Sequence, residues 1–293
     1  MTDWVRRVDG HRDCDLLSRL LPDDDPDDLE VRQGQFHIVV IGVDRVVCLP
    51  RTPAAAARLP ERAAALRTLA ALDLGFRTPE PLSQGGAAGT GEAPFLVLSR
   101  IPGEPLEADA LHDARVADTV AVQYAALLAS LARAGADEAV RAVIPQTLED
   151  RWRRFADDVR TELFQLMTTD GRLRAERELA ALDGLPHVTH AVVHGDLGAE
   201  NVLWEWTDGL PRLSGVLDWD DVALGDPAED LAAIGASYGR ELLARVLALG
   251  SSPDRGLPAR ITAIRGTFAL QQALYALRDG DDEQLADGLA GYR

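Results

Sequence analysis

The sequence of 293 residues contains no lysine, so its 30 basic residues are all arginines. A Walker A phosphate-binding loop needs a lysine, and its absence excludes the P-loop nucleotide triphosphatases. Long apolar runs are also missing, since none approaches the roughly 20 residues that a transmembrane helix requires. The first residues, Met1-Thr2-Asp3-Trp4, are acidic and polar, so we expect no signal peptide.

Cysteine is scarce as well. Only Cys14 and Cys48 are present, which fits a protein of the reducing cytoplasm rather than one held together by disulfides. Neither these cysteines nor the six histidines form an H-E-x-x-H or C-x-x-C pattern, so a zinc site is not expected.

Positive charge is in the minority, and the formal net charge is −18 at pH 7. Such a charge argues against nucleic-acid backbones and anionic membranes as partners. Two interpretations stay open: an ordinary acidic bacterial protein, or a protein whose acidic cleft attracts a polycationic ligand. No feature of the sequence indicates an obligate protein partner.

Hydrophobic patterning divides the chain into a strand-rich beginning and a helical remainder. The elements predicted in the first part are a helix at 1–21, strands at 29–33, 38–41, 45–49 and 95–98, and an alanine-rich helix at 54–72. The last of these strands leads into Pro102-Gly103, which breaks regular structure and marks a hinge at 99–103.

The remainder is predicted to be helical, apart from a β-pair at 191–219, with helices resuming from Pro227. Two amphipathic helix faces are predicted: Val116, Val120, Tyr124, Leu127 and Leu131 form the first, and Trp152, Phe155, Val159, Leu163 and Leu166 form the second. This organisation predicts an α+β chain with a small β-rich N-terminal lobe at 1–98 and a larger helical C-terminal lobe at 104–293.

The β-pair carries the most informative pattern of the chain, His194-Gly195-Asp196 followed by Asn201 and later by Asp218. Phosphoryl transfer to an alcohol needs a carboxylate at the hydroxyl, and an Asn and an Asp around a metal ion. We therefore predict a small-molecule kinase of the bilobal protein-kinase-like fold. In it, Asp196 is the general base, and Asn201 and Asp218 are ligands of Mg²⁺. The alternative is that all three are ordinary turn or strand-end residues.

Motifs next to this pattern have plainer interpretations. His194 is expected to brace the loop by hydrogen bonding, and Trp219 is expected to pack rather than to bind a ligand. Asp226-Pro227-Ala228-Glu229 has the order of a helix N-cap, a proline at the first helical position and a capping-box acid. The sequence from Gly235 to Gly239 matches a nucleophile elbow, but it continues a predicted helix and no histidine follows it.

A kinase needs a nucleotide, and a turn of the N-terminal lobe and the hinge are predicted to hold it. Gly34, Gln35 and Phe36 lie in the turn between the first two predicted strands, where backbone N–H groups can reach phosphate oxygens. At the hinge, the carbonyl of Ser99 and the N–H of Ile101 would serve an adenine edge.

The third predicted strand departs from the pattern of kinases. Kinases of this fold place a Lys or Arg there, paired with a helical Glu, to hold the α- and β-phosphates. The matching position is Cys48, and strand alternation directs Arg51 to the other face. Glu61 is a reasonable helical Glu. Either Arg51 or another arginine replaces the missing cation, or phosphate binding depends on Mg²⁺ and the glycine turn.

Three acidic residues near the predicted metal ligands are candidates for contact with a substrate. Asp220 and Asp221 either meet a cationic substrate or are solvated charges, and the two interpretations are equally open. Glu200, which precedes Asn201, is grouped with them as a substrate contact.

On these residues, the chain resembles the aminoglycoside phosphotransferase family, in which H-G-D-x-x-x-x-N and a following Asp-Trp mark the catalytic segment. More closely, it resembles the branch that acts on the tuberactinomycins viomycin and capreomycin, through residues 34–37, 73–79, 96–103 and 266–275. The resemblance implies ATP-dependent, Mg²⁺-assisted phosphorylation of a hydroxyl on a basic cyclic-peptide antibiotic, and hence resistance. The alternatives are another cationic alcohol as substrate, such as an aminoglycoside, or a nucleotide-binding pseudokinase.

Overall fold

The computed structural model describes residues 11–34, 36–86, 93–250 and 254–293. The first half of the helix predicted at 1–21 and the predicted nucleotide contact Gln35 lie outside the described residues. The chain divides into two compact units, Met1–Pro105 with Val202–Asp220, and Leu106–Asn201 with Asp221–Arg293. The segment 202–220 thus groups with the N-terminal residues. The predicted lobes, 1–98 and 104–293, divide the chain only at the hinge and place this segment in the C-terminal lobe.

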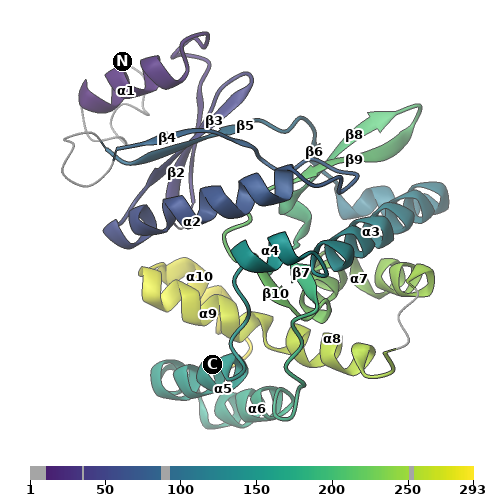
Figure 1. The fold of residues 1–293 in the computed structure, drawn as a ribbon. Helices are drawn as coiled ribbons and strands as arrows, with labels where there is room; N and C mark the ends of the chain where they lie inside the picture. Colours follow the sequence, from purple (N-terminus) through teal and green to yellow (C-terminus); the bar gives the residue numbers. More distant parts are fainter. Residues whose placement is uncertain (1–10, 35, 87–92, 251–253) are drawn as a thin grey trace. The chain divides into compact units, whose positions relative to one another are not determined.

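The first unit is built on a five-stranded antiparallel sheet in the order β1-β2-β3-β5-β4 (Figure 1). Its strands are β1 (Glu30–Gln33), β2 (His37–Ile41), β3 (Arg45–Pro50), β4 (Pro81–Gly85) and β5 (Phe95–Ser99). Four of these strands are confirmed to within one residue of the predicted bounds. β4 is not predicted, because its residues lack the alternation of apolar and polar side chains that marks a strand.

The two faces of this sheet pack against different helices. α1 (His11–Leu20) packs against the face that carries Val47 and Val97. α2 (Pro53–Ala70), which confirms the predicted alanine-rich helix, contacts β3, β4 and β5. Because side chains alternate along a strand, Cys48 points to the face opposite Val47, where α2 lies.

A second sheet in the same unit consists of β6 (Glu104–Pro105), β8 (Val202–Thr207) and β9 (Leu210–Val216). β8 and β9 form an antiparallel hairpin in which Val202 pairs with Val216. The segment before β4 anchors this hairpin, since Arg77 donates its N–H to the Ser214 carbonyl and accepts from the Val216 N–H, both at 3.0 Å. Asp218 lies two residues beyond the last pair of this anchored hairpin.

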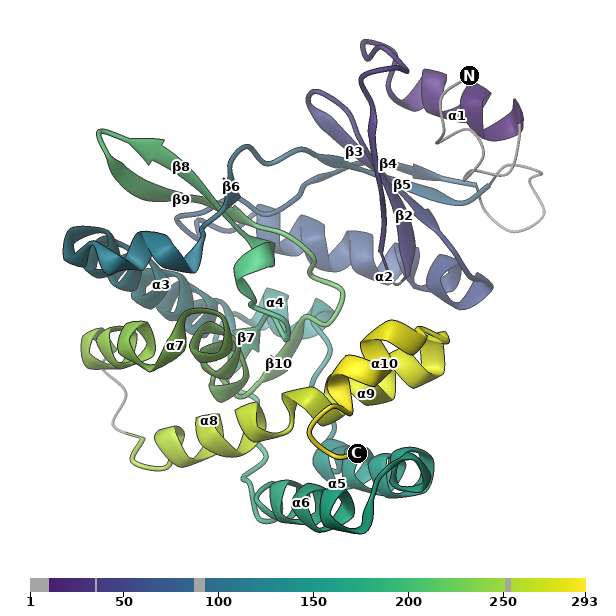
Figure 2. The same ribbon diagram turned by 180° about the vertical axis from the view of Figure 1, so that it is seen from behind.

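The second unit is mainly helical, as predicted, and holds one two-stranded sheet (Figure 2). Its strands are β7 (Ala191–Val193) and β10 (Ala223–Gly225). Its helices are α3 (Ala114–Ala134), α4 (Glu138–Val143), α5 (Arg151–Asp158), α6 (Thr169–Ala180), α7 (Ala228–Leu249), α8 (Leu257–Gly266), α9 (Phe268–Asp279) and α10 (Asp282–Gly288). α3 packs against both α7 and β7, so the strand that leads into the predicted catalytic motif is backed by long helices.

The first predicted amphipathic face is confirmed, whereas the second belongs to a shorter helix than predicted. All five residues of the first face are buried in α3. α5 ends at Asp158. A π-helical turn (Val159–Leu163) and a short 3-10 turn (Phe164–Leu166) follow it directly. Leu166 is 37% exposed, because the change in helical pitch rotates it away from the buried side. None of the helices in the described ranges combines the length and the apolar character needed to cross a membrane.

Candidate active site

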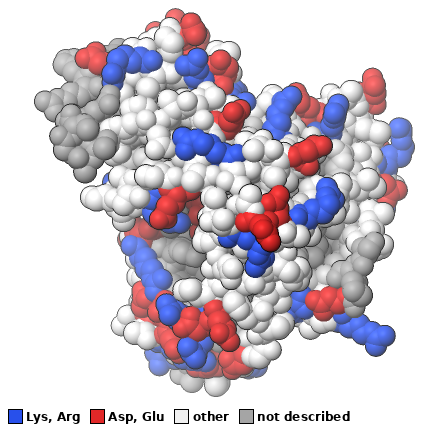
Figure 3. Space-filling model, viewed as in Figure 1, with Lys and Arg blue, Asp and Glu red and all other residues white. Residues whose placement is uncertain are grey.

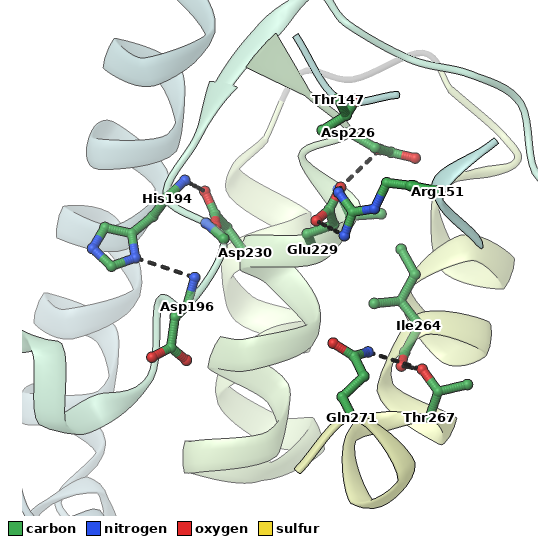
Figure 4. Close-up of polar contacts among 12 residues, drawn as sticks. Thr147, Arg151, His194, Asp196, Asp226, Glu229, Asp230, Ile264, Thr267 and Gln271 are labelled. Carbon is green, nitrogen blue, oxygen red and sulfur yellow. Dashed lines mark hydrogen bonds and ion pairs between the residues drawn. The ribbon is translucent and has the colours of Figure 1, made fainter. Parts of the chain in front are cut away.

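The loop that follows β7 is held in place by a buried carboxylate on α7 (Figure 4). Oδ2 and Oδ1 of Asp230 accept hydrogen bonds from the backbone N–H groups of His194 and Gly195, each at 3.0 Å. Asp230 is 1% exposed. Burial raises the pKa of this carboxyl to about 7, although the two N–H donors lower it. The backbone ahead of Asp196 is therefore fixed by a residue that the sequence patterns do not identify.

Two further side chains support the same loop. His194 is fully buried, and its Nδ1 accepts a hydrogen bond from the Asp196 N–H at 3.2 Å. An imidazole that accepts at Nδ1 is neutral, which confirms the bracing role predicted for His194. On α7, Ser237 Oγ accepts from the Ala199 N–H at 3.0 Å. The G-x-S-x-G pattern thus lies in the helical part of α7 that ends at a kink at Gly239, whose φ is +82°. It supports the loop and forms no nucleophile elbow.

Asp196 and Asn201 are joined directly within this loop. Nδ2 of Asn201 donates to the Asp196 carbonyl oxygen at 2.9 Å and to its carboxylate Oδ2 at 3.0 Å. Asp196 is exposed, whereas Asn201 is 9% exposed. One amide group therefore orients a carboxylate that a substrate hydroxyl can still reach. The remaining oxygen, Asn201 Oδ1, is the atom that could bind a metal ion.

The glycine between His194 and Asp196 is required by the backbone. Gly195 has a φ of +89°, and a Cβ atom there would lie 2.9 Å from the carbonyl oxygen of Asp221. Any other residue would be strained in conformation and would also collide with the segment that leads into β10. The loop thus packs tightly against the residues that follow the predicted second metal ligand.

Asp218 follows β9 in an unusual backbone conformation. Its φ is +53°, a left-handed conformation that costs a non-glycine residue on the order of 1 kcal/mol and is found disproportionately at functional sites. Trp219 packs as predicted, being 2% exposed. Its Nε1 donates to the Val216 carbonyl at 2.9 Å and its ring stacks on Phe76. This anchoring holds the backbone on either side of Asp218.

The oxygen atoms of Asn201 and Asp218 are of the kind that Mg²⁺ prefers. Among the described residues, no three His, Cys, Asp or Glu side chains gather around a point that could hold a metal ion. Mg²⁺ usually keeps several waters and takes only one or two side-chain ligands together with substrate phosphates. Each of these two oxygens is thus of the kind that binds a magnesium ion arriving with a nucleotide, and their action as ligands of one ion stays a prediction.

On the sheet face covered by α2, the cation beside Cys48 is Arg62. Nε of Arg62 lies 2.5 Å from Oδ1 of Asp220, and the Arg62 and Cys48 side chains are hydrogen-bonded. The paired side chains are only 13% and 15% exposed, so Asp220 is not a solvated charge. Burial lowers the pKa of the Arg62 guanidinium, and its interactions with Cys48, Asp220 and Asp218 raise it. The second effect is larger, so the pKa is raised overall. Arg62 therefore stays protonated.

Arg51, the first candidate to replace the missing cation, and Glu61, the candidate helical Glu, both lie elsewhere. Arg51 donates from Nη1 to the Gly34 carbonyl at 3.0 Å, and its backbone N–H donates to the Phe36 carbonyl at 2.9 Å. Arg51 therefore supports the turn that is predicted to reach phosphates. Glu61 is exposed, because it is one residue from Arg62 and hence about 100° away around the helix.

The predicted hinge residues border a cavity in the first unit. Ser99 donates its N–H to the Glu80 carbonyl and accepts the Glu80 N–H at its Oγ, both at 2.9 Å. Ser99 and Ile101 line a cavity of about 360 Å³ together with residues of α2 and of the segment 72–80. Their contacts to an adenine edge stay predictions.

In the second unit, Tyr275 on α9 shares one region with acidic residues. Burial raises the pKa of its phenol, and Asp221 and Asp196 raise it further, while Arg151 and Arg278 oppose them. Tyr275 is 51% exposed, and Asp221 and Asp196 are also exposed. An aromatic ring near exposed carboxylates is suited to a cationic ligand. The sequence patterns did not identify Tyr275.

The segment predicted to cap α7 does so, and its acidic side chains also form ion pairs. Asp226 Oδ1 accepts from the Ala228 N–H at 3.0 Å, and Arg260 donates to the same carboxylate at 2.6 and 3.1 Å. The predicted capping-box role of Glu229 is confirmed, because its carboxylate accepts a hydrogen bond from the backbone N–H of Asp226, and the same carboxylate is also paired with Arg151 at 2.8 Å (Figure 4). Asp226 is therefore structural, as predicted, but through a buried ion pair as well as through the cap.

The net negative charge is not gathered into one acidic surface on the face shown in Figure 3. Acidic and basic side chains are interspersed there, and many arginines are paired with carboxylates within the same helix or with a neighbouring one. On this face, attraction for a cationic ligand must therefore come from a local group of carboxylates.

Comparison with known proteins agrees with this geometry. Residues 26–258 match the sequence profile of the phosphotransferase enzyme family. The viomycin phosphotransferase of Streptomyces vinaceus is 68% identical over 289 residues, which cover 99% of this chain and 100% of that protein.

Solved structures confirm the α+β kinase-like fold. The GDP complex of aminoglycoside 2′-phosphotransferase-IIIa is similar with a TM-score of 0.78 and 20% identity, over 94% of this chain and 95% of that chain. The streptomycin–ATP ternary complex of APH(2″)-IIa is similar with a TM-score of 0.68 and 19% identity, over 95% and 94% of the two chains. With its H-G-D-x-x-x-x-N loop and the profile match over most of its length, the chain belongs to the phosphotransferase enzyme family.

Proposed function

We propose that this phosphotransferase inactivates an antibiotic by transferring the γ-phosphate of ATP to a hydroxyl of viomycin or of the related tuberactinomycin capreomycin. The observation that carries the proposal is the exposed Asp196 carboxylate held by the Asn201 amide at 3.0 Å. The 68% identical viomycin phosphotransferase supports the choice of substrate. The need for ATP supports action in the cytoplasm.

In the proposed reaction, the drug hydroxyl attacks the γ-phosphorus of ATP, and the bond from that phosphorus to the bridging oxygen breaks to release ADP. Asp196 accepts the hydroxyl proton as the new oxygen–phosphorus bond forms. Because the transferred group passes through a loose transition state, the residues of the site act mainly by positioning and by balancing charge.

Asn201 and Asp218 are the proposed ligands of Mg²⁺, which when bound would balance the charge of the phosphate oxygens. The register of the β8–β9 hairpin supports this pairing. Val202 pairs with Val216, so Asn201 lies one residue and Asp218 two residues beyond the last pair, at the same end of the hairpin. Consecutive Cα atoms are about 3.8 Å apart, which leaves both residues close to that end.

The cationic substrate is proposed to meet Asp221, Glu200 and the ring of Tyr275. The carboxylates offer charge to the basic groups of the drug, and the aromatic face offers a cation–π contact. Transfer of a phosphate would add a dianion to the drug, which would weaken its attraction to ribosomal RNA phosphates.

Mass spectrometry tests the proposal directly. Viomycin, capreomycin and an aminoglycoside panel are each incubated with enzyme, ATP and Mg²⁺, and fragmentation locates the added phosphate. We expect one phosphoryl group on a tuberactinomycin, and none with the Asp196→Asn variant, whose fold is checked by its melting temperature. Transfer only to aminoglycosides would contradict the substrate, and binding of drug without any turnover of ATP would contradict the enzymatic function.

A further inference from the structure

The first unit lacks the cation that a kinase-like site needs at the third strand. A strand Lys, oriented by a helical Glu, holds the α- and β-phosphates in this fold. Here β3 carries Cys48, a buried free thiol, and the sequence contains no lysine at all. Only an arginine can therefore supply a permanent positive charge at this place.

Arg62 is the arginine whose side chain reaches Cys48. It comes from α2, the helix that would carry the Glu of the usual pair. The positive charge is therefore on the helix here and not on the strand. The carboxylate partner has moved as well. It is Asp220, whose Oδ1 lies 2.5 Å from Arg62 Nε, and whose backbone carbonyl accepts a hydrogen bond from Arg58 at 3.1 Å.

A buried ring nitrogen at this position is left without a hydrogen-bond partner among the described residues. His37 lies against the pair, with Nδ1 3.5 Å from Arg62 Nη1 and 3.6 Å from Asp220 Oδ2. Among the described residues, His37 Nε2 is buried and has no hydrogen-bond partner. The His37 side chain is 9% exposed. Buried donors without acceptors are rare and costly, and a bound ligand atom is a common explanation.

We propose that Arg62 binds the α- and β-phosphates of the nucleotide, with Asp220 orienting its guanidinium, so that this pair takes the place of the strand-lysine and helix-glutamate pair. The inference deepens the proposed function and rests on it. Asp220 is two residues from Asp218, the proposed metal ligand, and both carboxylates act on the Arg62 charge. A phosphate held near Asp218 would thus meet Arg62, whose planar fork of donors matches phosphate oxygens.

Nucleotide affinity tests this assignment. Isothermal titration with ATP, ADP and adenosine is carried out on the full-length wild type and on Arg62→Gln. Loss of a charge-assisted contact should weaken ATP and ADP by about 10- to 100-fold and leave adenosine unchanged. The matched control is Arg67→Gln, which makes the same change at an exposed position of the same helix, where Arg67 contacts only Gln84 at 3.4 Å among the described residues. It should bind all three ligands like the wild type.

A second variant separates phosphate binding from stability. Removing one partner of a buried ion pair leaves an unpaired charge, whereas removing both is far better tolerated. The double variant Arg62→Gln/Asp220→Asn should therefore melt close to the wild type and still lose ATP and ADP affinity. Adding Cys48→Lys to Arg62→Gln should restore much of that affinity, because it returns a cation to the strand.

The outcomes distinguish this inference from the proposed function. A wild type that binds no ATP overturns the proposed function itself. If the wild type binds ATP, the inference is overturned by either of two results: unchanged ATP affinity in the folded Arg62 variants, or equal weakening of ATP and adenosine. Failure of Cys48→Lys to restore any ATP affinity would overturn it as well.

Discussion

The side-chain amide of Asn201 donates to both the carbonyl oxygen and the carboxylate of Asp196, at 2.9 and 3.0 Å. A single residue therefore fixes the proposed base and presents its own Oδ1 to the proposed metal ion. Base and metal are joined by one amide group, so a change at Asn201 should disturb both.

Replacing Asn201 with alanine tests this link. We expect Asn201→Ala to lower kcat by at least about 100-fold, since general base catalysis contributes that much or more. The Mg²⁺ concentration for half-maximal activity should rise at the same time, because one ligand is lost. Initial rates across a Mg²⁺ titration measure both effects. A normal Mg²⁺ requirement would contradict the ligand role, and a normal kcat would contradict the orienting role.

The buried carboxylate of Asp230 should be irreplaceable by its amide. Asp230→Asn keeps the shape but turns an NH₂ group toward one of the two backbone N–H groups of His194 and Gly195. Leaving one buried donor unsatisfied should cost about 1–3 kcal/mol in the free energy of unfolding, measured by urea denaturation. kcat should fall as the loop loosens. A variant with full stability and full kcat would show that the loop does not need this support.

The stability of the first unit should depend on pH through His37. Burial, together with Arg62 and Arg58, lowers the pKa of His37 to about 4, against about 6.5 in an unfolded chain. Between these values the unfolded chain binds a proton that the folded one does not. Stability should therefore rise with pH from about 4 to 6.5 and be lost as pH falls through that window.

The difference between the two pKa values corresponds to about 3 kcal/mol. Unfolding free energies at several pH values should show this dependence in the wild type and not in His37→Asn. The control His112→Asn changes a histidine whose side chain is 84% exposed, and its curve should run parallel to that of the wild type. Parallel curves for the wild type and His37→Asn would rule out this histidine as the source.

Recognition of the cationic drug should depend on Asp221 and on ionic strength. Asp221→Asn should raise KM for viomycin several-fold at low salt and leave KM for ATP unchanged. The effect should shrink as salt rises, because charges are screened over about 8 Å at 0.15 M. Asp208→Asn, the same change in the exposed β8–β9 turn, is the control. A drug KM that ignores both the substitution and the salt would contradict electrostatic recognition.

The parts of the fold and site that follow from local sequence could be predicted. The three strands from Glu30 to Pro50 have tight turns and clear apolar patterns, and the structure confirms them. The same is true of the apolar strand that leads into His194 and of the bracing role of that residue. Each of these depends on residues within a few positions of one another, where spacing and chain geometry leave few alternatives.

Residues whose roles depend on packing between distant segments could not be predicted. Asp230 acts on backbone groups 35 and 36 residues earlier in the chain, and no short motif records that contact. Glu61 and Arg62 are neighbours on α2, and only the way the helix lies on the sheet decides which of them faces Cys48. The second partner of Glu229 was not predicted for the same reason, because Arg151 comes from a separate helix.

The thiol that stands on β3 opposite Arg62 also decides how this enzyme can be detected and inhibited. Nucleotide-derived acylating reagents label kinases by forming a stable amide with an amine beside the bound phosphates. In this chain that position offers only sulfur and a guanidinium, and no side-chain amine exists anywhere in it. Amine-directed activity probes should therefore leave the enzyme unlabelled even when it is fully active. A covalent inhibitor would instead have to be a soft electrophile small enough to reach a thiol that is 2% exposed.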